Sequence, residues 1–228
     1  MDTLGLVTFL RTNILDDTGG TGVDWASITH NDESSFQLRW TNEELVDNIN
    51  EAILQVYRRS NPIKDVIPLN ILANTDVYTL PNYVTKIALV KREDGKAIVE
   101  KEVDEVWMLP YKAGALIYYS SDYTTNSFRI YPTPKVDEVI SLLIYRDPLV
   151  KLSWSTPTVT PELRSSYHVP MLNYAAYLSY MKDEANTSDP TRAATFSNMF
   201  DKEFPPTSVY SQIRKSRTSN RPVKYIGI

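Results

Sequence analysis

The hydrophobic pattern of this chain changes its period twice, and that change limits the fold more than any other feature of the sequence. Before Pro62 and after about Pro161, apolar residues recur every three or four positions, as they do in amphipathic helices. Between these points, for about ninety residues, apolar and polar residues alternate in short runs rich in Val, Ile and Tyr, which is typical of half-buried strands. This order predicts an α+β protein in which a β-domain is inserted between helical segments.

Four helical segments are predicted, at residues 3–15, 42–59, 161–184 and 188–204. Thr41 and Glu44 form a capping box at the start of the second segment. Thr160 followed by Pro161 suits the start of the third, which Pro170 then kinks or restarts. Because the outer helices can bury their apolar stripes only against one another, we expect two N-terminal and two C-terminal helices to form one helical bundle.

Seven short runs are predicted as strands, at residues 66–72, 77–80, 84–92, 97–103, 115–120, 127–131 and 139–145. Asp94 and Gly95 lie between the third and the fourth run, where they suit a tight hairpin turn and therefore an antiparallel pair. No helix-length segment separates the runs, which argues against a parallel sheet. We expect an antiparallel β-sandwich or a small barrel.

The domain organisation that follows is a helical bundle of residues 1–61 and 160–204, an inserted β-domain of residues 62–159, and an arm of residues 205–228. The whole chain has a net charge of -4, yet the arm holds five basic residues and no acid. A basic segment with few large apolar groups is not expected to fold alone, and it usually binds an acidic surface on a protein or a nucleic acid. We expect the arm to become ordered only on assembly.

The composition excludes most cofactor chemistry. The chain has no cysteine and two histidines, His30 and His168, so disulfides and cysteine-based metal sites are excluded and a histidine zinc site is not expected. Residues 19–24 match the start of a calcium-binding repeat, but one copy of that repeat does not bind metal, so we interpret residues 16–35 as a long flexible loop. Neither a phosphate-binding loop nor a dinucleotide fingerprint occurs.

Groups that would support hydrolysis are poorly arranged in the sequence. The acidic pairs Asp104–Glu105 and Asp137–Glu138 consist of neighbours, and neighbours on a strand point to opposite faces. His168 follows two serines, but the nucleophile elbow of a hydrolase is missing, and we interpret His168 as a polar residue on a helix surface. No catalytic residue, metal site or cofactor is predicted. With neither a leader nor an apolar run of membrane-spanning length, no membrane contact is expected.

Three short motifs, together with the order of the elements, carry a resemblance to a known family. They are Asp76-Val77-Tyr78-Thr79-Leu80-Pro81, Phe128-Arg129-Ile130-Tyr131-Pro132-Thr133-Pro134 and Ile144-Tyr145-Arg146-Asp147-Pro148. With a helix pair before them and another after them, the chain resembles the head-to-tail adaptor (connector) proteins of tailed bacteriophages over about residues 1–205. The loop at residues 16–35 has no counterpart in the family pattern.

This resemblance implies a structural virion protein that forms a homo-oligomeric ring, typically of about twelve subunits, at the head–tail junction. Such a ring is assembled in the host cytoplasm, lies beneath the portal protein and contacts the tail nozzle or tail-tube protein. DNA passes through its lumen without sequence-specific binding. An acidic body suits such a conduit, because a basic wall would retain DNA through many ion pairs.

Within the arm, which the resemblance directs to a portal subunit, we predict that the partner is bound by Arg214, Lys215, Arg217, Arg221, Val223, Lys224, Tyr225 and Ile226. The basic residues would steer the approach, and the apolar residues near the end would add as a strand to a sheet edge of the partner.

Two other functions are also compatible with the sequence. One is a nucleic-acid-binding module that acts through the basic arm. The other is a tail-associated glycan-cleaving enzyme, which would need carboxylates that converge across strands from Glu102, Asp104 and Asp137.

Overall fold

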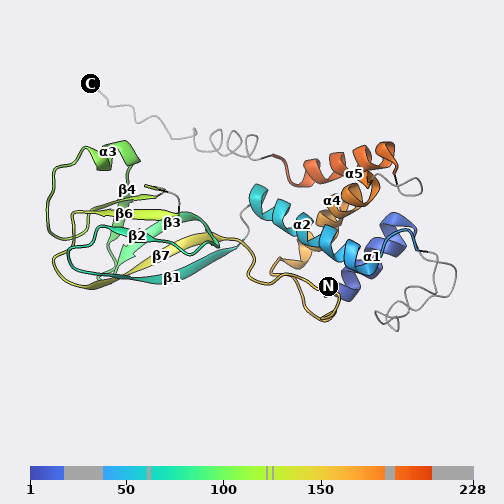
Figure 1. The fold of residues 1–228 in the computed structure, drawn as a ribbon, viewed down its shortest axis with the longest axis horizontal. Coiled ribbons are helices and arrows are strands. Elements are labelled where there is room, and N and C mark those ends of the chain that lie inside the picture. Colours follow the sequence, from blue (N-terminus) through green and yellow to red (C-terminus); the bar gives the residue numbers. More distant parts are fainter. Residues whose placement is uncertain (18–37, 61–62, 122, 125, 183–187, 207–228) are drawn as a thin grey trace, which may run out of the picture. The chain divides into compact units, whose positions relative to one another are not determined.

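The fold comprises two compact units, one mainly helical and one built on a sheet (Figure 1). The computed structural model describes residues 1–17, 38–60, 63–121, 123–124, 126–182 and 188–206. The helical unit takes in Met1–Ser60 and Val150–Ile228, and the β-unit covers Asn61–Leu149. The chain is therefore a mixed α+β protein, as the two periods of its sequence predict.

The helical unit begins with α1 (Thr3–Phe9), which continues as the π-helix η1 (Leu10–Leu15), and its other elements are α2 (Asn42–Ser60), the 3-10 turn η3 (Ser165–Tyr167), α4 (His168–Met181) and α5 (Pro190–Glu203). The first, second and fourth predicted helices are confirmed, and their observed ends lie within two residues of the predicted ends. The third starts later than the predicted residue 161, because Arg164 is still extended with ψ 139°. Pro170 lies in the first turn of α4, where its missing N–H costs no hydrogen bond, so it starts the helix and does not kink it.

α4 is the central helix of this unit and packs against α2, α5 and η1. Its small-residue face is buried, at Leu172, Ala175, Ala176, Ser179 and Tyr180. The apolar face of α2 is also buried, at Leu45, Ile49, Ala52, Ile53 and Val56. These two faces supply much of the core of the helical unit.

The segment between the sheet and η3 belongs to the helical unit. Leu152 exchanges two hydrogen bonds of 2.9 Å with the Asn50 side chain, and Val159 O accepts from the backbone N–H of Thr3 at 2.8 Å. Residues 150–159 therefore tie α1 to α2. None of the helices in the described ranges combines the length and the apolar character that a membrane crossing needs.

The β-unit is one seven-stranded sheet that curls around a single hydrophobic core (Figure 1). Its strands are β1 (Lys64–Ile71), β2 (Val77–Thr79), β3 (Val84–Arg92), β4 (Ala97–Glu100), β5 (Tyr118–Ser121), β6 (Ser127–Tyr131) and β7 (Glu138–Arg146). They lie in the order β1-β7-β3-β4-β5-β6-β2. The seven predicted strands are confirmed, but one curled sheet takes the place of the predicted sandwich or small barrel.

β4 joins the two halves of this sheet and departs from the predicted antiparallel order. It pairs with β3 across the predicted hairpin turn, in which Gly95 has φ 81°. Its last residues, Val99 and Glu100, pair with β5 in parallel. A parallel pair needs a crossover connection, and here that connection contains the short helix α3 (Val103–Trp107), which the sequence did not predict.

Candidate functional site

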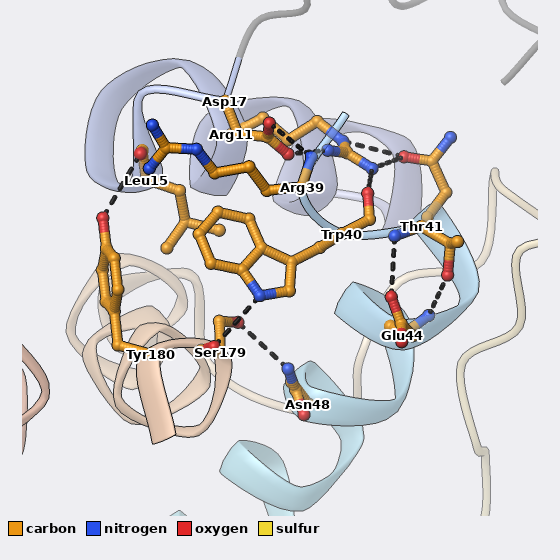
Figure 2. Close-up of polar contacts among 11 residues, drawn as sticks. Arg11, Leu15, Asp17, Arg39, Trp40, Thr41, Glu44, Asn48, Ser179 and Tyr180 are labelled. Carbon is orange, nitrogen blue, oxygen red and sulfur yellow. Dashed lines mark hydrogen bonds and ion pairs between the residues drawn. The ribbon is translucent and has the colours of Figure 1, made fainter. Parts of the chain in front are cut away.

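Two arginines of the helical unit hold the residues that flank segments 18–37 and 207–228. The first, Arg11 of η1, is completely buried and forms an ion pair with Asp17 (Figure 2). Its guanidinium also donates to Trp40 O at 2.6 Å and to Asn42 Oδ1 at 2.8 and 2.9 Å. A buried charge is tolerated when it is paired and hydrogen-bonded, so this network fixes η1 against the start of α2.

Asp17 and Arg39 meet at the base of residues 18–37. One carboxylate oxygen of Asp17 pairs with Arg11, and the other accepts the backbone N–H of Arg39 at 3.0 Å (Figure 2). The N–H of Asp17 donates in turn to Arg11 O at 3.1 Å. The chain therefore leaves the described fold at Asp17 and re-enters it beside the same side chain.

Trp40 connects this base to the central helix. Its indole N–H donates to Ser179 O at 3.0 Å, and its ring meets Tyr180 edge-on with centroids 5.5 Å apart (Figure 2). The Tyr180 hydroxyl donates to Leu15 O at 3.3 Å. Both aromatic side chains are buried with their polar atoms hydrogen-bonded, which is the arrangement that makes such residues stabilising in a core.

The start of α2 is fixed by the predicted capping box. Thr41 N donates to Glu44 Oε2 at 2.9 Å, and Glu44 N donates to Thr41 Oγ1 at 3.2 Å (Figure 2). Burial alone would raise the pKa of the Glu44 carboxyl, but hydrogen bonds from Lys182 and from the Thr41 backbone lower this pKa below its ordinary value. The carboxylate is therefore charged at neutral pH and joins α2 to the end of α4.

The second arginine, Arg59, holds the last turn of α5. Its guanidinium pairs with Asp201, donates to Phe204 O at 2.8 Å and lies 4.8 Å from the centre of the Phe200 ring. An arginine can make these contacts together because its planar fork both donates and stacks. The residues that lead into the predicted arm are thus attached to the end of α2.

A comparison with protein families completes this description. A family model described as SU10 adaptor protein matches residues 1–224. The chain belongs to the SU10 adaptor protein family. This family consists of phage adaptor proteins, so the chain has a structural role as a component of the virion. No curated protein matches the sequence.

Membership of the SU10 adaptor protein family bears on several predictions. A phage adaptor is predicted from the motifs and is confirmed, and the match extends beyond residue 205, where the resemblance was expected to end. The structural role of the family is consistent with the prediction that the chain is not an enzyme.

The predicted contact residues of the arm lie outside the described residues, namely Arg214, Lys215, Arg217, Arg221, Val223, Lys224, Tyr225 and Ile226. The family match nevertheless includes the first six of them. Most of the predicted loop at residues 16–35 also lies outside the described part of the chain. The first two residues of this predicted loop, Asp16 and Asp17, lie in the described part of the chain, and Asp17 forms the buried ion pair with Arg11.

The acidic pairs are not arranged as neighbours on a strand. Asp104 and Glu105 lie on α3, and Glu105 pairs with Lys101 at 3.0 Å. Of the second pair, Glu138 forms an ion pair with Arg92, whereas Asp137 accepts a hydrogen bond from the backbone N–H of Ala73 at 2.7 Å. Within the described ranges, no three histidine or acidic side chains lie close enough together to hold a metal ion.

The prediction that His168 lies on a helix surface is wrong. The side chain is 4% exposed, with Nδ1 at 2.8 Å from the amino group of Met1 and Nε2 at 3.2 Å from Leu163 O. Burial lowers the pKa of His168, a hydrogen bond to Leu163 opposes this, and the positive charge of the terminal amine lowers the pKa further. His168 is a neutral residue that holds the start of the chain.

The role of Arg11 was missed by sequence reasoning, although a signal existed. Arg11 follows Val7 by four positions, which places it on the apolar face of the first predicted helix. A charged residue on such a face requires a buried partner. Asp17 is the nearby acid that provides it.

Proposed function

We propose that this SU10-family adaptor forms a homo-oligomeric ring that joins the capsid portal to the tail, and that DNA passes through the ring. Family membership supports the adaptor role. The number of subunits, about twelve, comes from the resemblance to head-to-tail adaptors. On the tail side, the ring would meet the nozzle or tail-tube protein.

The observation that carries this proposal is the contrast between the body and its arm. The arm has five basic residues and no acid, whereas the chain as a whole has a net charge of -4. Arg59 attaches the last described turn before this arm to α2 through Asp201 and Phe204. A C-terminal segment that follows an attached turn and has a basic, partly apolar sequence is suited to bind an acidic surface on another protein.

We further propose that the end of the arm is the anchor on the portal. Val223, Lys224 and Tyr225 alternate between apolar and polar, and Ile226 adds a further apolar side chain, a pattern that suits addition to a sheet edge. Arg214, Lys215 and Arg217 would steer the encounter, an effect that salt weakens.

Co-sedimentation with purified portal protein tests this proposal. A chain that ends at Asn220 should fail to co-sediment, while its circular dichroism spectrum stays that of the full chain. Charge reversal of Arg214, Lys215 and Arg217 should slow attachment and leave it complete at long times. Normal attachment of the chain that ends at Asn220 would show that the last residues are not the anchor. Failure of the full chain to bind the portal would refute the proposed function itself.

A further inference from the structure

The β-unit carries a group of exposed apolar side chains that its own fold does not use. Trp107, Met108 and Tyr111 are 67%, 82% and 80% exposed. They lie at the end of α3 and in the loop that follows, beside the exposed acids Glu102, Asp104 and Glu105. We call these six residues the tip. Grouped, exposed large apolar residues mark an interaction surface, and Trp and Tyr are the residues that most often dominate binding energy.

Trp107 is held in position although most of it is exposed. Its ring stacks on Tyr123 with centroids 5.7 Å apart and planes inclined by 25°. The Tyr123 hydroxyl accepts from Arg129 at 3.2 Å, and Arg129 pairs with Asp76 at 3.1 Å. A side chain that is already fixed loses little conformational freedom when it binds, so the tip is prepared for a partner.

A second exposed surface lies on the outward face of β1, β7 and β3. Along the middle of β7, buried residues alternate with more exposed ones, and Ile140, Leu142 and Ile144 point inward. On the other face, Val66 lies opposite Leu143, which lies opposite Leu89. Val66 is 61% exposed, so this apolar strip is partly open.

Lysines border the apolar strip. Lys64 and Lys86 lie opposite Tyr145 in the register, and Lys91 lies opposite Ser141. All three lysines are exposed, and no carboxylate in the described part of the chain pairs with them. We call Lys64, Val66, Lys86, Leu89, Lys91 and Leu143 the sheet face.

The tip and the sheet face are complementary in chemistry. Each has an apolar centre, but the tip is bordered by Glu102, Asp104 and Glu105, the last of which also pairs with Lys101, whereas the sheet face is bordered by lysines. Trp107 and Val66 are both exposed, so the described residues of the same copy do not cover these centres. We propose that the tip of one copy docks on the sheet face of the next copy. Burial of Trp107 and Met108 would hold the pair, and the opposite charges would set its orientation.

Such a contact joins two different surfaces and therefore repeats from copy to copy until the assembly closes. The inference rests on the proposed ring and names one contact between its subunits. It also predicts that the contact is directional, with one tip and one sheet face used at each junction.

Cysteine cross-linking tests the contact directly, because the natural chain contains no cysteine. Full-length Met108→Cys and Val66→Cys variants are mixed, with and without portal protein, and treated with a short bis-maleimide. A cross-linked dimer is expected in the mixture and in neither variant alone. Val136, which is 69% exposed and lies outside both surfaces, provides the matched control. Val136→Cys mixed with Met108→Cys should give no dimer.

Charge exchange provides a second test on the same cross-link. Reversing Lys64, Lys86 and Lys91 to Glu in the Val66→Cys chain should lower the cross-link yield by about fivefold or more. Reversing Glu102, Asp104 and Glu105 to Lys in the Met108→Cys chain should restore it. Circular dichroism of each variant checks that the fold is unchanged.

The inference is overturned if the Met108–Val66 pair gives no more dimer than the Val136 control, or if either single variant cross-links to itself. Lack of rescue by the charge exchange counts against it as well. If a ring forms on the portal but this cross-link does not, the proposed function stands and only the proposed contact between the tip and the sheet face is refuted. A chain that neither cross-links nor binds the portal refutes both.

Discussion

Arg59 and Asp201, which are 142 residues apart in the sequence, pair across the ends of α2 and α5. The same guanidinium donates to Phe204 O and covers the ring of Phe200. Arg59 therefore contributes, together with the packing of the Phe204 ring on Tyr167 and Phe200, to holding the last described turn before the predicted arm.

Replacement of Arg59 should loosen that turn. Arg59→Gln removes the ion pair and the contact with the Phe200 ring, so we expect the free energy of unfolding to fall by about 1–3 kcal/mol. Amide hydrogen exchange at residues 201–204 should become faster. Arg58→Gln is the matched control, since the Arg58 side chain is 61% exposed. Equal exchange in the two variants would show that Arg59 does not hold the turn.

Replacement of Arg11 should have a larger effect. Arg11→Met leaves the Asp17 carboxylate buried without its cation, so we expect a loss of about 3–5 kcal/mol in the free energy of unfolding. Urea unfolding measures this loss. The double variant Arg11→Met/Asp17→Leu should recover part of it, because both charges are then removed. Additive losses in the double variant would contradict the coupling of these two residues.

Acidification should weaken the fold through His168. Burial lowers its pKa, so below the ordinary value of 6.5 the unfolded chain takes up a proton that the folded chain resists. Its contribution to stability is present above pH 6.5 and is lost as pH falls toward the lowered pKa. The free energy of unfolding, measured from pH 5 to 8, should show this slope in the natural chain and a smaller one in His168→Gln. An unchanged slope in His168→Gln would assign it to other groups.

Alkaline conditions should weaken the β-unit through Tyr119. Burial, with a smaller effect of nearby Glu100, raises the pKa of Tyr119 to about 12. The unfolded chain releases this proton near pH 10, so the contribution of Tyr119 is present below pH 10 and lost as pH rises toward 12. Ultraviolet absorbance titration should lose one late tyrosine transition in Tyr119→Phe. Loss of an early transition would mean that Tyr119 is accessible to water.

Elements with local signals could be predicted from the sequence. The Thr41–Glu44 capping box, the Asp94-Gly95 turn and the apolar face of α2 each depend on residues close together in the chain. The helix α3 was missed because its five residues are too few for a helical period to emerge. The parallel pairing of β4 with β5 depends on that same connection and was missed with it.

The candidate site depends on contacts between residues far apart in the chain, which the local sequence pattern does not predict. The sequence around His168 predicts an exposed helix residue, because the contact of its ring with the amino group of Met1 joins residues 167 positions apart. Trp40 likewise finds its acceptor at Ser179. Arg11 is the exception, because its place on an apolar face was visible in the sequence.

The meeting of Asp17 with Arg39 has a consequence for how such adaptors can evolve. Since residues 17 and 39 are fixed side by side, the stretch between them can gain or lose residues without moving η1 or α2. The entropic cost of bringing the two ends of a loop together rises only with the logarithm of its length, about 0.6 kcal/mol per doubling. Natural selection can therefore vary the number of residues between Asp17 and Arg39 in a lineage of phages while η1 and α2 stay unchanged.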